Sequence, residues 1–256
     1  MSSPIVDADC HISSGSIDPA AIAGDKLVAQ MDCAGIDRAL VWLKPRYDKQ
    51  IEPENRAVHA ACACHPERLL GFGWVNPMLG HDATGATIQR VFEEYDLLGI
   101  KFNGAQDGYV IDDPDLALPL IELAAGYGKP LAFHIGADFY ENTHPWRLGW
   151  IAAAFPETTF IMIHMGGASL PSLHRAAIEV AGEHPSIHLI GNGIPEGPVL
   201  QATTTLGADR VSFGSDTPFR MLHVQLAMYR ALLRDLPEED VDAVLGGNIL
   251  RVLGVD

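Results

Sequence analysis

The sequence is short of basic residues and of long apolar runs, and each shortage excludes a class of protein. Lys and Arg number 17 against 33 Asp and Glu, so the formal net charge is −16. Nucleic acids and anionic membrane surfaces bind surplus Lys and Arg, so we expect neither as a partner. No apolar run approaches the ~18 residues of a membrane-spanning helix, and no signal peptide is visible. We therefore expect a cytoplasmic protein.

Cysteines are also few, and none of them forms a CxxC pair: they are Cys10, Cys33, Cys62 and Cys64. This usage is typical of free thiols in a reducing compartment. The apolar fraction of 48% and the charged fraction of 20% are ordinary for a globular chain and exclude a disordered one. A length of 256 residues suits one large domain or two small ones.

One pattern recurs along the chain: a short apolar run, a polar loop, and then a helical stretch. The runs are rich in Val, Ile, Leu and Phe and are too short for globular helices, so we interpret them as strands. Between two of them, Asp112-Asp113-Pro114 predicts a helix start with a capping carboxylate and an early proline. The expected strands are Ile5–Cys10, Arg38–Leu43, Gly71–Asn76, Gly99–Asn103, Leu131–Ile135, Thr159–His164, Ile187–Gly191 and Arg210–Gly214.

The strand starts recur about every 30 residues, which is the size of a strand–helix–strand unit. Eight parallel strands alternating with helices predict an α/β fold, a single-domain (β/α)8 TIM barrel over residues 1–256. A doubly wound sheet is the alternative, but it usually carries a glycine-rich phosphate turn after its first strand. Residues 7–11 read Asp-Ala-Asp-Cys-His there instead, which favours the barrel.

The barrel topology sorts the 11 histidines, because chemistry in such folds lies at the C-terminal ends of the strands. Three histidines, His11, His134 and His164, fall at those ends together with Asp9 and Asp216. The other eight fall on helices, in loops or at the opposite end. Asp9 and His11 are two residues apart, so both point to one side of their strand.

Burying Asp9 and Asp216 together is costly unless a cation compensates their charge. A divalent metal supplies that charge, and oxygen and nitrogen ligands suit Zn²⁺, Mn²⁺ or Fe²⁺. We expect one such ion, with zinc as the first choice and manganese or iron as the others. A polar network without metal is the alternative.

At these residues the chain resembles the amidohydrolase superfamily, in the branch that holds metal-dependent hydrolases together with decarboxylases of the aminocarboxymuconate-semialdehyde and resorcylate types. The similarity covers the whole chain, and it is specific because the matching motifs follow one another in the family's order. The matching motifs are Val6–His11, Gly99–Phe102, Phe133-His134, His164–Gly167, Phe213–Pro218 and Gly247–Gly254.

The resemblance implies a metal held by Asp9, His11, His134 and Asp216, with His164 as a catalytic residue. One position departs from the family pattern, because Asp9 stands where many hydrolases have His and some decarboxylases have Glu. Asp is shorter than Glu by one methylene group, so Asp9 either binds the metal directly, binds it through water, or does not bind it. Lys101 either bridges two metals, as in binuclear relatives, or pairs with an inner carboxylate, and we favour the pairing.

The first function we expect is a metal-dependent hydrolase of a small lactone, ester or amide. Asp216 would take the proton of a metal-activated water, and His164 would stabilise the oxyanion. The alternative is a metal-dependent, non-oxidative decarboxylase of a small cyclic or unsaturated acid, in which Asp216 protonates the carbon that loses CO2. The third hypothesis is a metal-free barrel without catalytic activity.

The expected partner is a small-molecule substrate, and the resemblance also allows a homodimer. Arginine suits a carboxylate on the substrate because its guanidinium forms paired hydrogen bonds with it. The substrate-binding residues we expect at the barrel rim are Arg46, Lys101, Asn103, His144 and Arg220.

Overall fold

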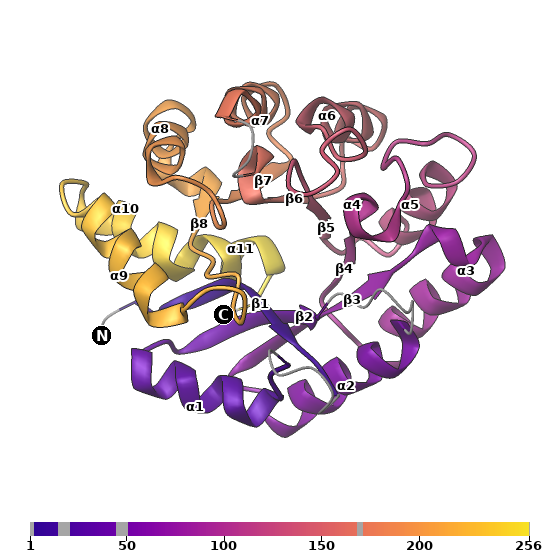
Figure 1. The fold of residues 1–256 in the computed structure, drawn as a ribbon, viewed down its shortest axis with the longest axis horizontal. Helices are drawn as coiled ribbons and strands as arrows, with labels where there is room; N and C mark the ends of the chain where they lie inside the picture. The colour runs from indigo at the N-terminus through magenta and orange to yellow at the C-terminus, as the bar shows by residue number, and fades with distance from the viewer. Residues whose placement is uncertain (1–2, 15–20, 45–50, 168–170, 256) are drawn as a thin grey trace.

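The computed structural model describes residues 3–14, 21–44, 51–167 and 171–255. Eight parallel strands lie side by side in chain order and form a nearly closed barrel (Figure 1). The predicted (β/α)8 barrel is confirmed, and each expected strand is present with small shifts at its ends. The strands are β1 (Val6–Ile12), β2 (Arg38–Leu43), β3 (Leu69–Val75), β4 (Gly99–Phe102), β5 (Leu131–His134), β6 (Phe160–Ile163), β7 (Ile187–Ile190) and β8 (Val211–Ser212).

Main-chain hydrogen bonds connect β1, the first strand of the sheet, with the segment that follows β8, the last strand. The His11 N–H donates to the Thr217 carbonyl at 2.7 Å, and the Asp216 N–H donates to the Asp9 carbonyl at 2.9 Å. The segment after β8 therefore continues along β1 beyond the end of β8 itself. This continuation sets Asp216 beside Asp9, although the two residues are far apart in sequence.

The helices cover the outside of the barrel, as Figure 1 shows. The helix start predicted at residues 112–114 is wrong. The Asp113 carboxylate instead accepts hydrogen bonds from the N–H groups of Asp115 and Leu116 and forms a turn, and the helix begins at Leu118. The helices are α1 (Gly24–Ala34), α2 (Ile51–Cys64), α3 (His81–Gln89), α4 (Gly104–Asp107), α5 (Leu118–Ala125), α6 (Pro145–Ala154), α7 (Pro171–Glu183), α8 (Glu196–Leu206), α9 (Leu222–Leu233), α10 (Glu238–Asp242) and α11 (Asn248–Leu253).

Alternating residues of the strands build two apolar cores. Residues such as Val41 and Phe133 pack with the helices, whereas Leu40 and Ile161 face the barrel interior. Helix α11 lies against β1 and β8 and adds Ile249, among other residues, to the interior core (Figure 1). It closes the barrel at the end where the strands begin, so the opposite end is the one left for a site.

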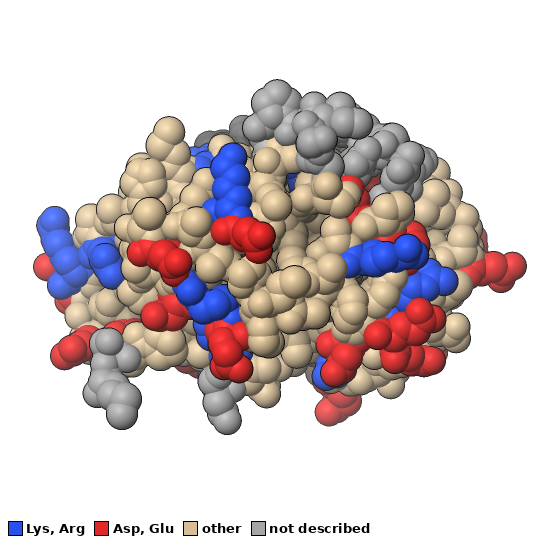
Figure 2. All heavy atoms as spheres, turned by 90° about the horizontal axis from the view of Figure 1, so that it is seen from below, with Lys and Arg blue, Asp and Glu red and all other residues tan. Residues whose placement is uncertain are grey.

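The side of the molecule that carries α1 and α2 shows basic and acidic side chains interspersed over its surface (Figure 2). Within the described residues, none of the helices is both long enough and apolar enough to span a membrane.

Candidate active site

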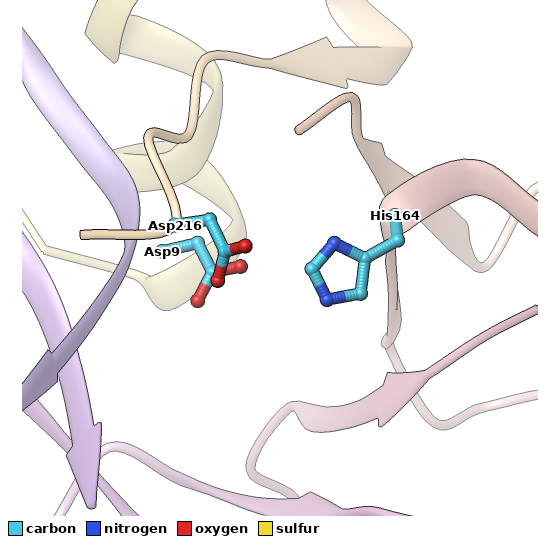
Figure 3. Close-up of side chains that lie close together, drawn as sticks. All are labelled: Asp9, His164 and Asp216. Carbon is cyan, nitrogen blue, oxygen red and sulfur yellow. The ribbon is translucent and has the colours of Figure 1, made fainter. Parts of the chain in front are cut away.

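Three side chains that could hold a cation meet at the C-terminal ends of the strands. Asp9 lies on β1, His164 directly follows β6, and Asp216 follows β8. One possible ligand atom from each of them lies within 4.8 Å of the others. Figure 3 shows the two carboxylates side by side, with the His164 ring facing them across a gap.

The backbone around this cluster adopts conformations that are rare outside glycine. His164 has φ 69°, Met165 has φ 44°, Asp138 has φ 60° and Asp216 has φ 62°. Such left-handed φ values cost free energy and concentrate at functional sites, where the surrounding structure holds them. These left-handed φ values turn the chain out of the strand direction at His164 and Asp216, at the rim of the barrel.

His11 lies next to the cluster, but its ring is already hydrogen bonded on both sides. Its Nδ1 is 2.9 Å from the Leu43 carbonyl oxygen, and the Trp42 Nε1–H donates to its Nε2 at 3.1 Å. The Nε2 atom also lies 3.4 Å from Asp9 Oδ1 and 3.7 Å from Asp216 Oδ1. In this arrangement its lone pair is occupied by Trp42, so direct metal binding by His11 would first require that hydrogen bond to break.

His134, at the end of β5, presents a free nitrogen to the same region. Its Nε2 is buried and has no hydrogen-bond partner among the described residues, and its ring centroid lies 4.6 Å from that of His164 in an edge-to-face contact. Asp138 Oδ2 is 3.7 Å from the same nitrogen. A buried imidazole nitrogen without a partner is costly, which indicates that a ligand satisfies it in the working protein.

Lys101, on β4, is fully buried beneath the cluster. Its Nζ lies 3.9 Å from Asp9 Oδ1 and 3.9 Å from the ring centroid of Trp42, with the Trp74 ring at 5.3 Å. These contacts are those of an ammonium paired with an inner carboxylate and stacked on aromatic faces.

The charges in the cluster shift one another's pKa values strongly. Burial and the neighbouring Asp9 raise the pKa of Asp216 to about 8. Burial alone would also raise the pKa of Asp9, but Lys101 and His11 outweigh it, so that pKa lies below its usual range. Burial lowers the pKa of Lys101 to about 8, against the opposing effect of Asp9. Without a cation, Asp9 is ionised while Asp216 keeps its proton.

Burial is also the main reason why the histidines of the site are neutral. It lowers the pKa of His164 to about 4 and holds those of His11 and His134 below their ordinary value. A neutral imidazole carries the lone pair that a metal needs. The site therefore combines two carboxylates, neutral imidazoles and the unsatisfied buried Asp9 Oδ1, and these residues fit a divalent cation.

Two predicted substrate-binding residues are engaged elsewhere. Asn103 is buried and caps α4, because its Oδ1 accepts from the Gln106 N–H and its Nδ2 donates to Gln106 Oε1. His144 caps α6, where its Nδ1 accepts from the Trp146 N–H at 3.3 Å. Both side chains cap the start of a nearby helix, and residue spacing alone does not predict this role.

Of the two predicted substrate-binding arginines, one lies within the described residues. Arg220 is exposed just beyond Asp216, and its charge acts to lower the pKa of that carboxyl. Arg147, also near the rim, is paired with Asp112 at 2.6 Å. Arg46 lies outside the described residues.

The site also contains Asn192 and Phe219, which the pattern of His and Asp at strand ends does not indicate. Asn192 follows β7 and its Nδ2 donates to Asp9 Oδ2. The Phe219 ring lies edge-to-face with His11 at 5.3 Å and is half exposed, so it forms an apolar wall at the mouth of the site. Neither residue is a His or an Asp, so the pattern that predicted the site does not include them. Their positions after predicted strands are the signal that could have indicated Asn192 and Phe219.

Comparisons with known proteins assign the family. The amidohydrolase family model matches residues 8–255. A 2-amino-3-carboxymuconate-6-semialdehyde decarboxylase of Dictyostelium discoideum is 24% identical over 84% of this chain and 69% of its own length. The chain therefore belongs to the amidohydrolase family and is an enzyme of that superfamily.

Two solved structures share the fold. The 2,6-dihydroxybenzoate decarboxylase from Rhizobium is 21% identical, with a TM-score of 0.78 over 98% of this chain and 99% of that one. A 5-carboxyvanillate decarboxylase from Novosphingobium aromaticivorans, complexed with manganese, is 16% identical, with a TM-score of 0.78 over 99% and 96% of the two chains.

These comparisons correct two expectations. The prediction of a hydrolase is wrong, because the curated relative and the structural neighbours are decarboxylases. The physical reason for the error is that the two reactions use the same residue types, so spacing could not separate them. The preference for zinc gains no support, since the neighbouring structure holds manganese.

Proposed function

We propose that the chain is a metal-dependent, non-oxidative decarboxylase of small, planar, unsaturated carboxylic acids. The observation that carries the proposal is the cluster of Asp9, His164 and Asp216 at the strand ends, whose possible ligand atoms lie within 4.8 Å of one another. The curated relative and the structural neighbours with this fold are decarboxylases. In the absence of a cation, burial and Asp9 shift the pKa of Asp216 upwards and favour its protonated form, so among the carboxyls of the cluster it is the one suited to deliver a proton to carbon.

The names of the relatives support the substrate class. 2,6-Dihydroxybenzoate, 5-carboxyvanillate and 2-amino-3-carboxymuconate semialdehyde are all unsaturated acids. The half-exposed Phe219 ring beside His11 offers a flat apolar surface on which such a molecule can lie.

The metal centre we propose is built on Asp9, His164 and Asp216, with His134 Nε2 as a further ligand. Its two carboxylates favour Mn²⁺. When bound, the ion supplies positive charge for the substrate carboxylate and a neighbouring oxygen.

The residues of the chain supply the rest of the reaction. Asp216 donates its proton to the carbon that bears the carboxylate. The bond between that carbon and the carboxylate then breaks, its electrons restore the unsaturated system, and CO2 leaves. Asp216 regains a proton from water. Lys101 stays beneath Asp9 and keeps that carboxylate ionised throughout.

The test is turnover of the purified protein, stripped with a chelator and reloaded with Mn²⁺, on 2,6-dihydroxybenzoate, 5-carboxyvanillate and a matched set of lactones, esters and amides. We expect CO2 release only with metal. In D2O the product carries one deuterium at the carbon that lost the carboxylate. Hydrolysis of the esters or lactones without CO2 from any acid would overturn the proposal. The homodimer stays a prediction that sedimentation velocity can check.

A further inference from the structure

Asn192 contacts two of the three residues of the proposed metal cluster. Its side chain is 1% exposed, and its Nδ2 donates a hydrogen bond to Asp9 Oδ2. Its main-chain oxygen lies 3.1 Å from Nδ1 of His164. If that Nδ1 carries the proton of the neutral ring, the His164 lone pair is on Nε2.

The bond from Asn192 makes the two oxygens of Asp9 different. Oδ2 is held by the amide, whereas Oδ1 is buried and has no hydrogen-bond partner in the part of the chain that the structure describes. Oδ1 instead lies 3.9 Å from Lys101 Nζ and 3.4 Å from His11 Nε2. One oxygen is therefore fixed, and the other is the oxygen available to a cation.

The loop around Asn192 is anchored on both sides. The Tyr229 hydroxyl donates to the Gly191 carbonyl on one side. On the other, Gly193 has φ +67°, and a Cβ there would lie 3.1 Å from His164 Nδ1. The left-handed φ and the close approach to His164 favour glycine at position 193, so the residues on both sides of Asn192 are restricted in where they can lie.

We propose that Asn192 is a positioning residue of the metal centre, which holds Asp9 so that Oδ1 faces the cation and so lets a carboxylate as short as aspartate serve as a ligand. This inference rests on the metal centre of the proposed function, not on the reaction it carries out. Residues that hydrogen bond to a metal ligand orient it, and losing one typically weakens metal binding about 10- to 100-fold.

The test is Mn²⁺ binding to the metal-free protein, measured by calorimetry and by the electron paramagnetic resonance spectrum of the bound ion. Asn192→Ala is expected to raise the Kd about 10- to 100-fold and to change the spectrum. The control is Asn248→Ala, at the other end of the barrel, where the amide donates to the Ala208 and Val211 carbonyls. That variant is expected to lose stability while the Kd of its folded fraction stays unchanged. Asn192→Ser gives a second variant should Asn192→Ala fail to fold.

Two further comparisons separate positioning from a structural role. In an Asp9→Ala background, Asn192→Ala is expected to weaken Mn²⁺ binding no further, because its effect passes through Asp9. The exchange of Asp9→Asn with Asn192→Asp restores an amide–carboxylate hydrogen bond and is expected to recover thermal stability but not Mn²⁺ affinity.

An unchanged Kd in Asn192→Ala, equal losses with and without Asp9, or full recovery of Mn²⁺ affinity by the exchange would each overturn the proposal. Because the readout is metal binding, a failure to release CO2 would overturn the reaction proposed above and leave this result standing. A parent protein that does not bind Mn²⁺ would overturn both.

Discussion

Both ends of the barrel contain buried polar groups, but the groups at one end are hydrogen bonded, whereas ligand atoms at the other end are not. Where the strands begin, His188 Nε2 lies 2.8 Å from Ser212 Oγ, and the Asn248 amide donates to two carbonyls. Where the strands end, no described residue forms a hydrogen bond with Asp9 Oδ1 or His134 Nε2.

This difference indicates which end of the barrel contributes less to the stability of the fold. Buried polar groups cost free energy unless they are satisfied, so one end is sealed by paired polar groups and the apolar face of α11. The other end leaves its ligand atoms unsatisfied and its backbone strained at His164 and Asp216. Changes at one end should therefore affect activity, and changes at the other should affect stability.

Substitutions at the two ends of β8 should show the largest contrast. Asp216→Asn removes the proton donor and a metal ligand, and we expect decarboxylation to fall about 1,000-fold. Asp209→Asn, on the exposed side just before β8, is expected to leave turnover unchanged. Initial rates of CO2 release by both variants provide the measurement. Comparable rates in the two variants would mean that Asp216 has no part in the proton transfer.

The closing helix should show the reverse behaviour. Ile249 is fully buried in the interior core, so Ile249→Ala is expected to lower the free energy of unfolding by about 3 kcal/mol through the cavity it leaves. Turnover per folded molecule should not change. Val252→Ala, at a half-buried position of the same helix, should cost less than about 1 kcal/mol. Urea unfolding measures both, and a loss of turnover in Ile249→Ala would break the separation of the two ends.

The acid dependence of stability should depend on His188. Burial lowers the pKa of His188 to about 3, so the folded protein binds its proton less readily than the unfolded chain, whose histidine has a pKa of 6.5. The stability from the neutral ring is full above pH 6.5 and is lost as pH falls towards 3.

Between pH 6.5 and 5 the natural protein should lose about 2 kcal/mol more than His188→Gln. Urea unfolding at several pH values gives both curves. Parallel curves would show that His188 does not resist protonation.

A pair of glycines with the same backbone conformation gives the smallest and sharpest comparison. Gly193 and Gly35 have φ +67° and +70°, but a Cβ at Gly35 meets no atom of the described residues within 4 Å, whereas one at Gly193 approaches His164 Nδ1. Both alanine variants should lose about 1 kcal/mol of stability. We expect only Gly193→Ala to reduce turnover, by about tenfold, and equal activities would show that this approach to His164 is not needed.

The sequence predicted the barrel because its signal is local. Each strand is a short apolar run, and their spacing matches one structural unit, so no long-range contact had to be known. The helix expected at residues 112–114 failed because a capping carboxylate also stabilises a turn, and only the surrounding contacts decide between the two.

For the site, the sequence by itself determined which strand ends carry Asp9, His134, His164 and Asp216, since parallel strands bring their C-terminal ends to one rim. It did not determine which atoms are free there. The bond from Trp42 to His11, the cap formed by Asn103 and the hold of Asn192 on Asp9 join segments that are distant in sequence or depend on side-chain rotamers. Only the tertiary structure decided these, because hydrogen-bond partners depend on distances that residue order leaves open.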